Sequence, residues 1–235
     1  MNTCQIHKPL SGAALKLIAC VSMLADHFCK ALPIPEPFFT ILSNVAGRIA
    51  FPLFCFLLSE GFFHTRNRGH YLRNMLILAL LSEVPFDLAH YGTPFYPDHQ
   101  NTCFTLLLGL LLFSCLHLLE QTHLSEQTAC PSFKIRGFQA IILVLAAAAA
   151  WFLKTDYGIL GICCLAAFYF FRYQPVQAAL LGCLILNLDW FGEPAAFLAL
   201  IPIYLYNGKR GLQLKYAFYA FYPLHLLLLA GLATL

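Results

Sequence analysis

Long apolar segments separated by short polar turns dominate the chain. They cover residues 12–32, 41–63, 74–91, 103–120, 137–153, 157–173, 175–190, 195–206 and 216–234. Most approach the roughly 20 residues that an α-helix needs to cross a bilayer. The seventh and eighth are short, which leaves eight spans as the alternative to nine. The separators are rich in Pro, Gly and charge, including the predicted turn at 66–69. The pattern predicts an all-α, polytopic transmembrane helix bundle.

Composition supports a membrane protein. Of the 235 residues, 60% are hydrophobic and 11% are charged, whereas a soluble domain carries about 25% charged residues. The turns are too short to divide the chain, so residues 1–235 form a single membrane domain with a short tail at 1–11. The net charge of +3 and the lack of a dense basic tract give no reason to expect nucleic-acid binding. The lipid bilayer is the expected environment.

The positions of Lys and Arg predict the orientation. With nine spans and a cytoplasmic N-terminus, the outer side holds only Lys30, Arg48 and Lys154 of the 14 cationic residues. Five carboxylates also lie on this outer side: Glu36, Asp98, Asp156, Asp189 and Glu193. Because Lys and Arg concentrate in cytoplasmic loops, the N-terminus is predicted to be cytoplasmic and the C-terminus to lie outside.

The ten cysteines are predicted to act as small hydrophobic residues. Eight of them lie inside apolar segments: Cys20, Cys29, Cys55, Cys103, Cys115, Cys163, Cys164 and Cys183. Free cysteine packs well in apolar surroundings, and none of the spacings is typical of a metal site. We therefore expect no bound metal.

Ionisable residues inside spans are candidates for function, because burying charge in a membrane is costly. In the first span, Lys16 and His27 are eleven residues apart, which places them within roughly 20° on one helix face and about 16 Å apart. A thin anionic cofactor could place its phosphates near Lys16 and its reactive end near His27. The alternative is a Lys16 that reaches to the interface and a His27 that is a hydrogen-bonded core residue. Asp26 points elsewhere, and Lys30 is its nearest local partner.

The second span adds Arg48 and Glu60, and Glu60 shares a helix face with His64. Arg66, Arg68 and Arg73 follow and form the densest cationic cluster. This cluster either anchors the loop to the membrane surface or binds phosphate groups, for which guanidinium is well suited.

The third span carries two carboxylates, Glu83 and Asp87, at positions i and i+4 on either side of Pro85. Like charges this close need a cation or a raised pKa. Arg48 of the second span is the candidate cation.

Several consecutive runs resemble the TraX family of bacterial inner-membrane proteins. They are MLADH at 23–27, GRIAFPLF at 47–54, EGFFHTR at 60–66, PFD at 85–87, the segment 101–109 and FYAFYPLH at 218–225. The resemblance is dense over residues 15–110 and 215–227. Between these two regions the chain shares only a hydrophobic pattern with the family.

The resemblance implies acetyl transfer in the bacterial inner membrane. The family's named member acetylates the N-terminal amine of a pilus subunit, and the family looks related to transmembrane acyltransferases that use cytoplasmic acetyl-CoA. Those enzymes carry Arg, ten residues, then His in their first helix; this chain has Lys16, ten residues, then His27. The implied acceptor is a pilin-like or other envelope amine or hydroxyl.

We therefore assign expected roles. His27 is the general base, since imidazole titrates near neutral pH, with Asp26 and Glu60 as further catalytic residues. The expected acetyl-CoA ligands are Lys16, Arg48, His64, Arg66, Arg68 and Arg73. We expect four further polar residues either to bind the substrate or to have a structural role: Glu83, Asp87, Asn101 and His225.

Two functions of other classes remain as alternatives. A proton-coupled transporter also uses charged residues within the membrane. Its internal repeats would place such residues in both halves of the chain, whereas here they are concentrated in the first 100 residues. A non-catalytic assembly factor would leave Lys16 and His27 without a common task.

Overall fold

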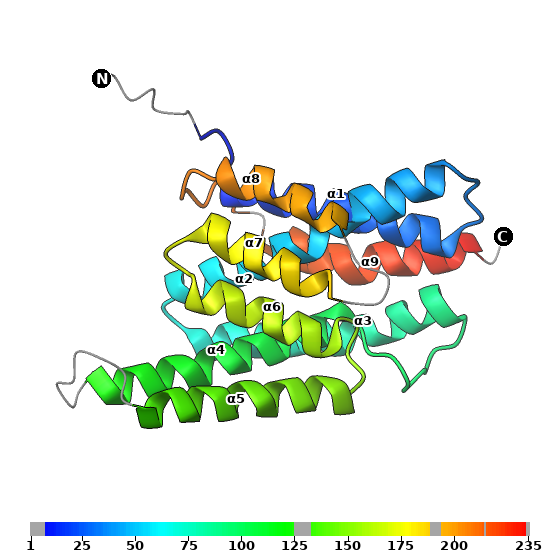
Figure 1. The fold of residues 1–235 in the computed structure, drawn as a ribbon. Coiled ribbons are helices and arrows are strands. Elements are labelled where there is room, and N and C mark those ends of the chain that lie inside the picture. The colour runs from blue at the N-terminus through cyan, green and yellow to red at the C-terminus, as the bar shows by residue number, and fades with distance from the viewer. Residues whose placement is uncertain (1–7, 125–132, 189–193, 214, 234–235) are drawn as a thin grey trace, which may run out of the picture.

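The protein is all-helical in a computed structural model that describes residues 8–124, 133–188, 194–213 and 215–233. Within these ranges the α-helices are α1 (Gly12–Ala31), α2 (Ala50–His64), α3 (Arg68–Tyr91), α4 (Thr102–Leu124), α5 (Phe133–Phe152), α6 (Gly158–Phe170), α7 (Pro175–Leu186), α8 (Leu200–Tyr204) and α9 (Lys215–Ala233). Three irregular helices precede α2 and α8: η1 (Thr40–Ala46), η2 (Gly47–Ile49) and η3 (Pro194–Ala199). The predicted polytopic helix bundle is confirmed (Figure 1).

Five described segments are long and apolar enough to cross a membrane: Gly12–Ala31, Thr40–His64, Thr102–Thr122, Phe133–Phe152 and Tyr216–Ala233. The predicted short segments are indeed short. The 12 residues of α7 rise only about 18 Å, less than the roughly 30 Å of a hydrocarbon core. Asp189, Glu193 and residues 1–7 of the predicted tail lie outside the described residues.

The third helix begins earlier than the sequence predicted. The polar run at 66–69 was expected to be a turn, but α3 starts at Arg68. Asn67 explains the difference, because its side-chain oxygen accepts a hydrogen bond from His70 N at 2.9 Å. Such an N-cap satisfies one of the open amides at the start of a helix, so the helix can include charged residues that sequence periodicity would leave out.

Successive long helices run in opposite directions (Figure 1), and backbone hydrogen bonds connect loops at each end of the bundle. At one end the start of α1 meets the end of α8, where Leu10 N donates to Leu205 O at 3.1 Å and Asn207 N donates to Leu10 O at 2.9 Å. At the other end Gln100 N donates to Lys154 O, and Asp156 N donates to Gln100 O, both at 3.0 Å. We call the first end, which carries most of the cations, the cationic end.

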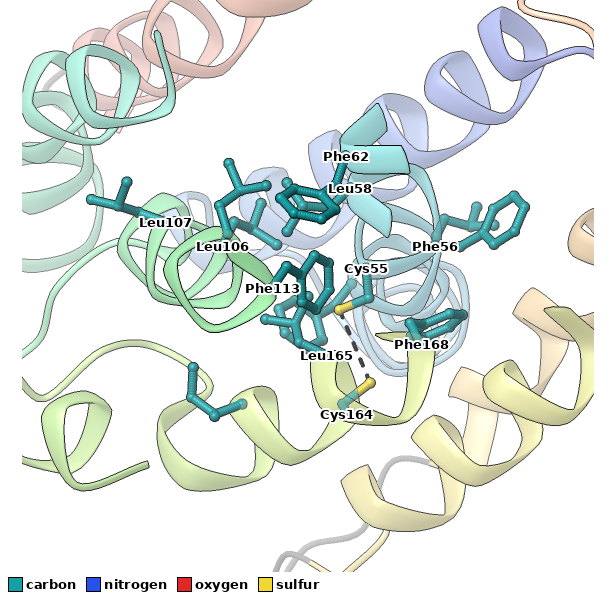
Figure 2. Packing of buried hydrophobic residues seen from close by; sticks show 14 of the residues in the cluster. Cys55, Phe56, Leu58, Phe62, Leu106, Leu107, Phe113, Cys164, Leu165 and Phe168 are labelled. Carbon is teal, nitrogen blue, oxygen red and sulfur yellow. Dashed lines mark hydrogen bonds between the residues drawn. The ribbon is translucent and has the colours of Figure 1, made fainter. Parts of the chain in front are cut away.

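The core lies where α2, α4 and α6 meet (Figure 2). Its largest fully buried side chains include Phe51, Phe62, Phe113, Phe168 and Tyr169. Six of the eight cysteines singled out above are buried, and the sulfur atoms of Cys55 and Cys164 are 4.0 Å apart within the core. Helix α9 packs against both α1 and α3 (Figure 1), which determines the site described next.

Candidate active site

A cavity of about 360 Å³ opens at the end of the bundle opposite the cationic end. It lies where α1, α3 and α7 finish and where α4 and α6 begin. Its polar lining comprises Asp26, His27, Lys30, Arg48, His90, Tyr91, His99, Thr102, Asp156 and Tyr157. The size suits a small reacting group with a few polar partners.

His27 lines this cavity and contacts a second histidine from the other end of the chain. His27 is only 7% exposed and His225 only 5%. Their Nδ1 and Nε2 atoms, respectively, are 2.8 Å apart. A third imidazole, that of His90, lies nearly perpendicular to His27, with ring centres 5.2 Å apart. The structure therefore brings together two predicted residues, His27 and His225, that the sequence did not connect.

The shared face of Lys16 and His27 is directed toward α9. Lys16 Nζ lies 5.6 Å from the ring centre of Phe218, and His27 meets His225 of the same helix. Ser11 accepts a hydrogen bond from Ala14 N at 3.3 Å and begins the helix. The eleven-residue spacing thus aligns both side chains as predicted, but Lys16 lies toward the cationic end and is not part of the cavity lining.

Asp26 occupies the adjacent face of α1. Its carboxylate pairs with Lys30 Nζ at 2.7 Å, as the i, i+4 spacing predicted, and accepts from Ser43 Oγ at 2.6 Å. A Cβ on Gly47 would lie 2.6 Å from Asp26 Cβ. Glycine therefore allows the second span to approach α1 closely at the cavity wall.

Arg48 enters the cavity lining from an irregular stretch of the second span. Thr40–Ala46 is π-helical and Gly47–Ile49 is a 3₁₀ turn before α2. Pro52 accounts for the break at Gly47–Ile49, because it has no N–H for the carbonyl of residue 48 and its ring crowds that carbonyl. Ser22 Oγ of α1 donates to two carbonyls of this irregular stretch, Ala46 O at 2.5 Å and Gly47 O at 3.1 Å.

The opposite wall was missed by sequence reasoning. Asp156 accepts a hydrogen bond from Thr102 Oγ1 and lies 3.6 Å from His99 Nε2. An isolated β-bridge between Gln100 and Thr155 joins the two loops that carry these residues. In the sequence, Asp156 is one of several outer carboxylates, and nothing in its spacing indicates that α6 begins beside α4.

Glu83, Asp87 and Asn101 form a layer behind the cavity. Asn101 Nδ2 donates to Glu83 and, at 2.9 Å, to Ala79 O. Asp87 accepts from Tyr96 N at 2.8 Å. Neutral amides, not Arg48, bind one oxygen of each carboxylate, which corrects the expected pairing. The other oxygens, Glu83 Oε1 and Asp87 Oδ1, are buried and accept no hydrogen bond among the described residues.

The other predicted residues lie at the cationic end and do not line the cavity. Glu60 was expected near His27 but accepts instead from Tyr206 Oη at 3.2 Å. His64 is 3.8 Å from Glu60, as their spacing predicted.

The arginines of this end surround the start of α3. The guanidinium of Arg68 lies 4.8 Å from the ring centre of Phe62, and Arg66 and Arg73 are exposed. The structure separates this cationic group from the cavity by most of the length of α1.

Comparisons with known proteins give a consistent result. The family model described as TraX protein matches residues 11–233. The probable fimbrial assembly protein FimC, serogroup H1, of Dichelobacter nodosus is 29% identical over 244 aligned residues, which cover 94% of this chain and 95% of that protein. The chain has no significant match among solved structures.

Proposed function

This chain belongs to the TraX family, and from that premise we propose that it is an acetyltransferase of the bacterial inner membrane. It moves the acetyl group of acetyl-CoA to an amine or hydroxyl of an envelope acceptor. The supporting observation is a buried imidazole, His27, that lines a polar cavity and is held by a second histidine at 2.8 Å. This is the geometry that a general base requires.

The cationic end receives the donor. Lys16, Arg66 and Arg68 lie there, and the concentration of Lys and Arg supports a cytoplasmic location for that side. Guanidinium and ammonium groups bind the phosphates of CoA. In this proposal the acetyl-bearing arm enters between α1 and α9, which contact each other at Lys16 and at His27, and extends over a rise of about 16 Å.

At the cavity, His27 removes the proton from the acceptor as its nitrogen or oxygen attacks the thioester carbon. Lys30, Arg48 and Asp156 surround this point and orient the acceptor. The new N–C or O–C bond forms, the C–S bond breaks, and the proton passes from His27 to the departing sulfur. Fixed geometry and proton transfer together supply the acceleration.

The acceptor is a pilin-like subunit in this proposal. The family resemblance and the fimbrial assembly name of the relative from Dichelobacter nodosus both support it. That name also favours a second candidate, an assembly factor without catalysis. The two differ in one respect: only the enzyme needs His27.

The test uses inverted inner-membrane vesicles that contain the full chain or a variant. Acetyl-CoA with a ¹³C-labelled acetyl group is added, and mass spectrometry follows the label in membrane proteins and lipids. The wild-type chain should transfer label, and His27→Ala should lower the rate by about 10²–10⁴ while acetyl-CoA binding persists, because a general base contributes to rate.

His117→Ala is the matched control. His117 is a partly buried histidine of α4 that does not line the cavity, and its variant should keep the wild-type rate. Equal labelling by wild type and His27→Ala would refute catalysis by this site. Absence of transfer in every sample, including wild type with pilin present, would favour the assembly factor.

A further inference from the structure

We propose that His225 is a positioning residue, which holds His27 in the tautomer with its proton on Nδ1 and so leaves Nε2 to take the acceptor's proton. The inference deepens the proposed function and rests on His27 being the base. His225 itself does not line the polar cavity. It therefore acts through His27 and not on the substrate.

The carbonyl of Phe221 determines the direction of the hydrogen bonds. His225 Nδ1 lies 2.8 Å from Phe221 O. A carbonyl oxygen only accepts, so His225 must carry its proton on Nδ1. In the neutral ring Nε2 is then an acceptor. Because Nε2 faces His27 Nδ1 at 2.8 Å, the proton of neutral His27 must be on Nδ1.

The two rings are aligned for this bond. Their planes differ by 4° and their centres are 5.1 Å apart, while the bonded nitrogens are 2.8 Å apart. The ring centres are farther apart than the bonded nitrogens because these nitrogens lie between the two centres. The hydrogen bond therefore lies nearly within both ring planes. Near-linear bonds of this length are strong and directional.

Helix α9 holds His225 rigidly enough to serve this role. Phe221 is one turn earlier on the same helix, and its ring stacks on that of His225 with centres 4.8 Å apart. Tyr222 and Leu226 on either side are buried. A ring that is packed and bonded at both nitrogens has one orientation available.

The consequence concerns where the proton is before reaction. Free histidine prefers the proton on Nε2, which is the nitrogen that must be empty in a base directed at the cavity. With His225 in place, the acceptor's proton goes to His27 Nε2. The Nδ1 proton of His27 shifts toward His225 Nε2, which spreads the positive charge, and one proton finally returns to the departing sulfur.

The experiment compares the full chain in lipid nanodiscs as wild type, His225→Gln and His225→Met. Glutamine places an oxygen near the position of Nε2, so it can accept from His27, whereas methionine fills a similar volume without an acceptor of comparable strength. NMR of ¹⁵N-labelled histidine reports which nitrogen of His27 is protonated. His27→Ala identifies the signals of that ring by their loss.

We expect the wild type and His225→Gln to show the Nδ1–H form of His27. His225→Met should change it to the Nε2–H form and lower acetyl transfer at least about a hundredfold, as loss of an orienting partner does in histidine-based catalysis. His225→Gln should recover most of this loss. His117→Met, the control for removing an imidazole away from the cavity, should change neither reading.

An Nε2–H form of His27 in the wild type would overturn the inference. Equal rates in His225→Gln and His225→Met would also overturn it, because packing alone would then account for the loss. The NMR reading does not depend on turnover. If the wild type shows the Nδ1–H form but transfers no acetyl group, the proposed function fails while the positioning of His27 stands.

Discussion

Replacing Asn101 by alanine should destabilise the protein more than any other single change in the wall behind the cavity. Asn101 is fully buried and joins α3 to α4. Its Nδ2 donates to Ala79 O and to the carboxylate of Glu83, and its Oδ1 accepts from Cys103 N at 2.9 Å. Alanine removes all three bonds at once.

The size of the effect follows from the nature of each bond. Capping the first turn of a helix contributes about 1 kcal/mol. A hydrogen bond between membrane helices contributes about 0.6–1.7 kcal/mol, and one to a carboxylate about 1.5–3 kcal/mol. We therefore expect a loss of about 3–6 kcal/mol for Asn101→Ala. For a chain of this length the melting temperature should fall by roughly 10 °C.

Thermal unfolding in detergent, followed by intrinsic fluorescence, measures this loss. Ser114→Ala is the matched control in the same helix. Ser114 Oγ donates to Leu110 O of its own helix at 2.7 Å, and such a bond adds little to stability, so the control should melt near the wild type. If Asn101→Ala melts within 2 °C (about 0.5–1 kcal/mol) of that control, the buried network does not stabilise the wall and the reasoning is refuted.

Two further predictions concern the ends of the bundle. A cysteine introduced at Asp98 should react with an impermeant thiol reagent added to intact spheroplasts, and one at Arg68 should react only after the membrane is opened; the reverse pattern would contradict a cytoplasmic N-terminus. Replacing Arg66 and Arg68 together by glutamine should weaken acetyl-CoA binding, measured by calorimetry, while the melting temperature stays near that of the wild type. Unchanged affinity would mean that these arginines only anchor the loop to the membrane surface.

Local sequence determined the helices and the contacts within them. Apolar segments of about 20 residues with few charges predict membrane helices because an unpaired backbone is too costly in lipid. Pairs within one helix were also predictable: Asp26 with Lys30, and Glu60 with His64, since i and i+4 share a face. The common face of Lys16 and His27 follows from the same periodicity.

Irregular backbone was harder to predict. Proline at position 52 indicates a disturbed helix. It does not indicate that residues 40–46 become π-helical or that Ser22 of another helix donates to the carbonyls of Ala46 and Gly47. The early start of α3 depends on the cap formed by Asn67. In both cases one side chain, Ser22 or Asn67, binds backbone groups at a boundary that hydrophobic periodicity alone does not locate.

Only the tertiary structure decided which candidates form a site. His27 and His225 are 198 residues apart and meet because α9 returns to pack against α1. Asp156 and Thr102 meet because the loops before α4 and α6 pair, whereas Glu60 lies at the opposite end of the bundle from His27. Periodicity predicts which face of a helix is buried. The order in which helices pack depends on side-chain fit between distant segments, which the periodicity of one sequence does not predict.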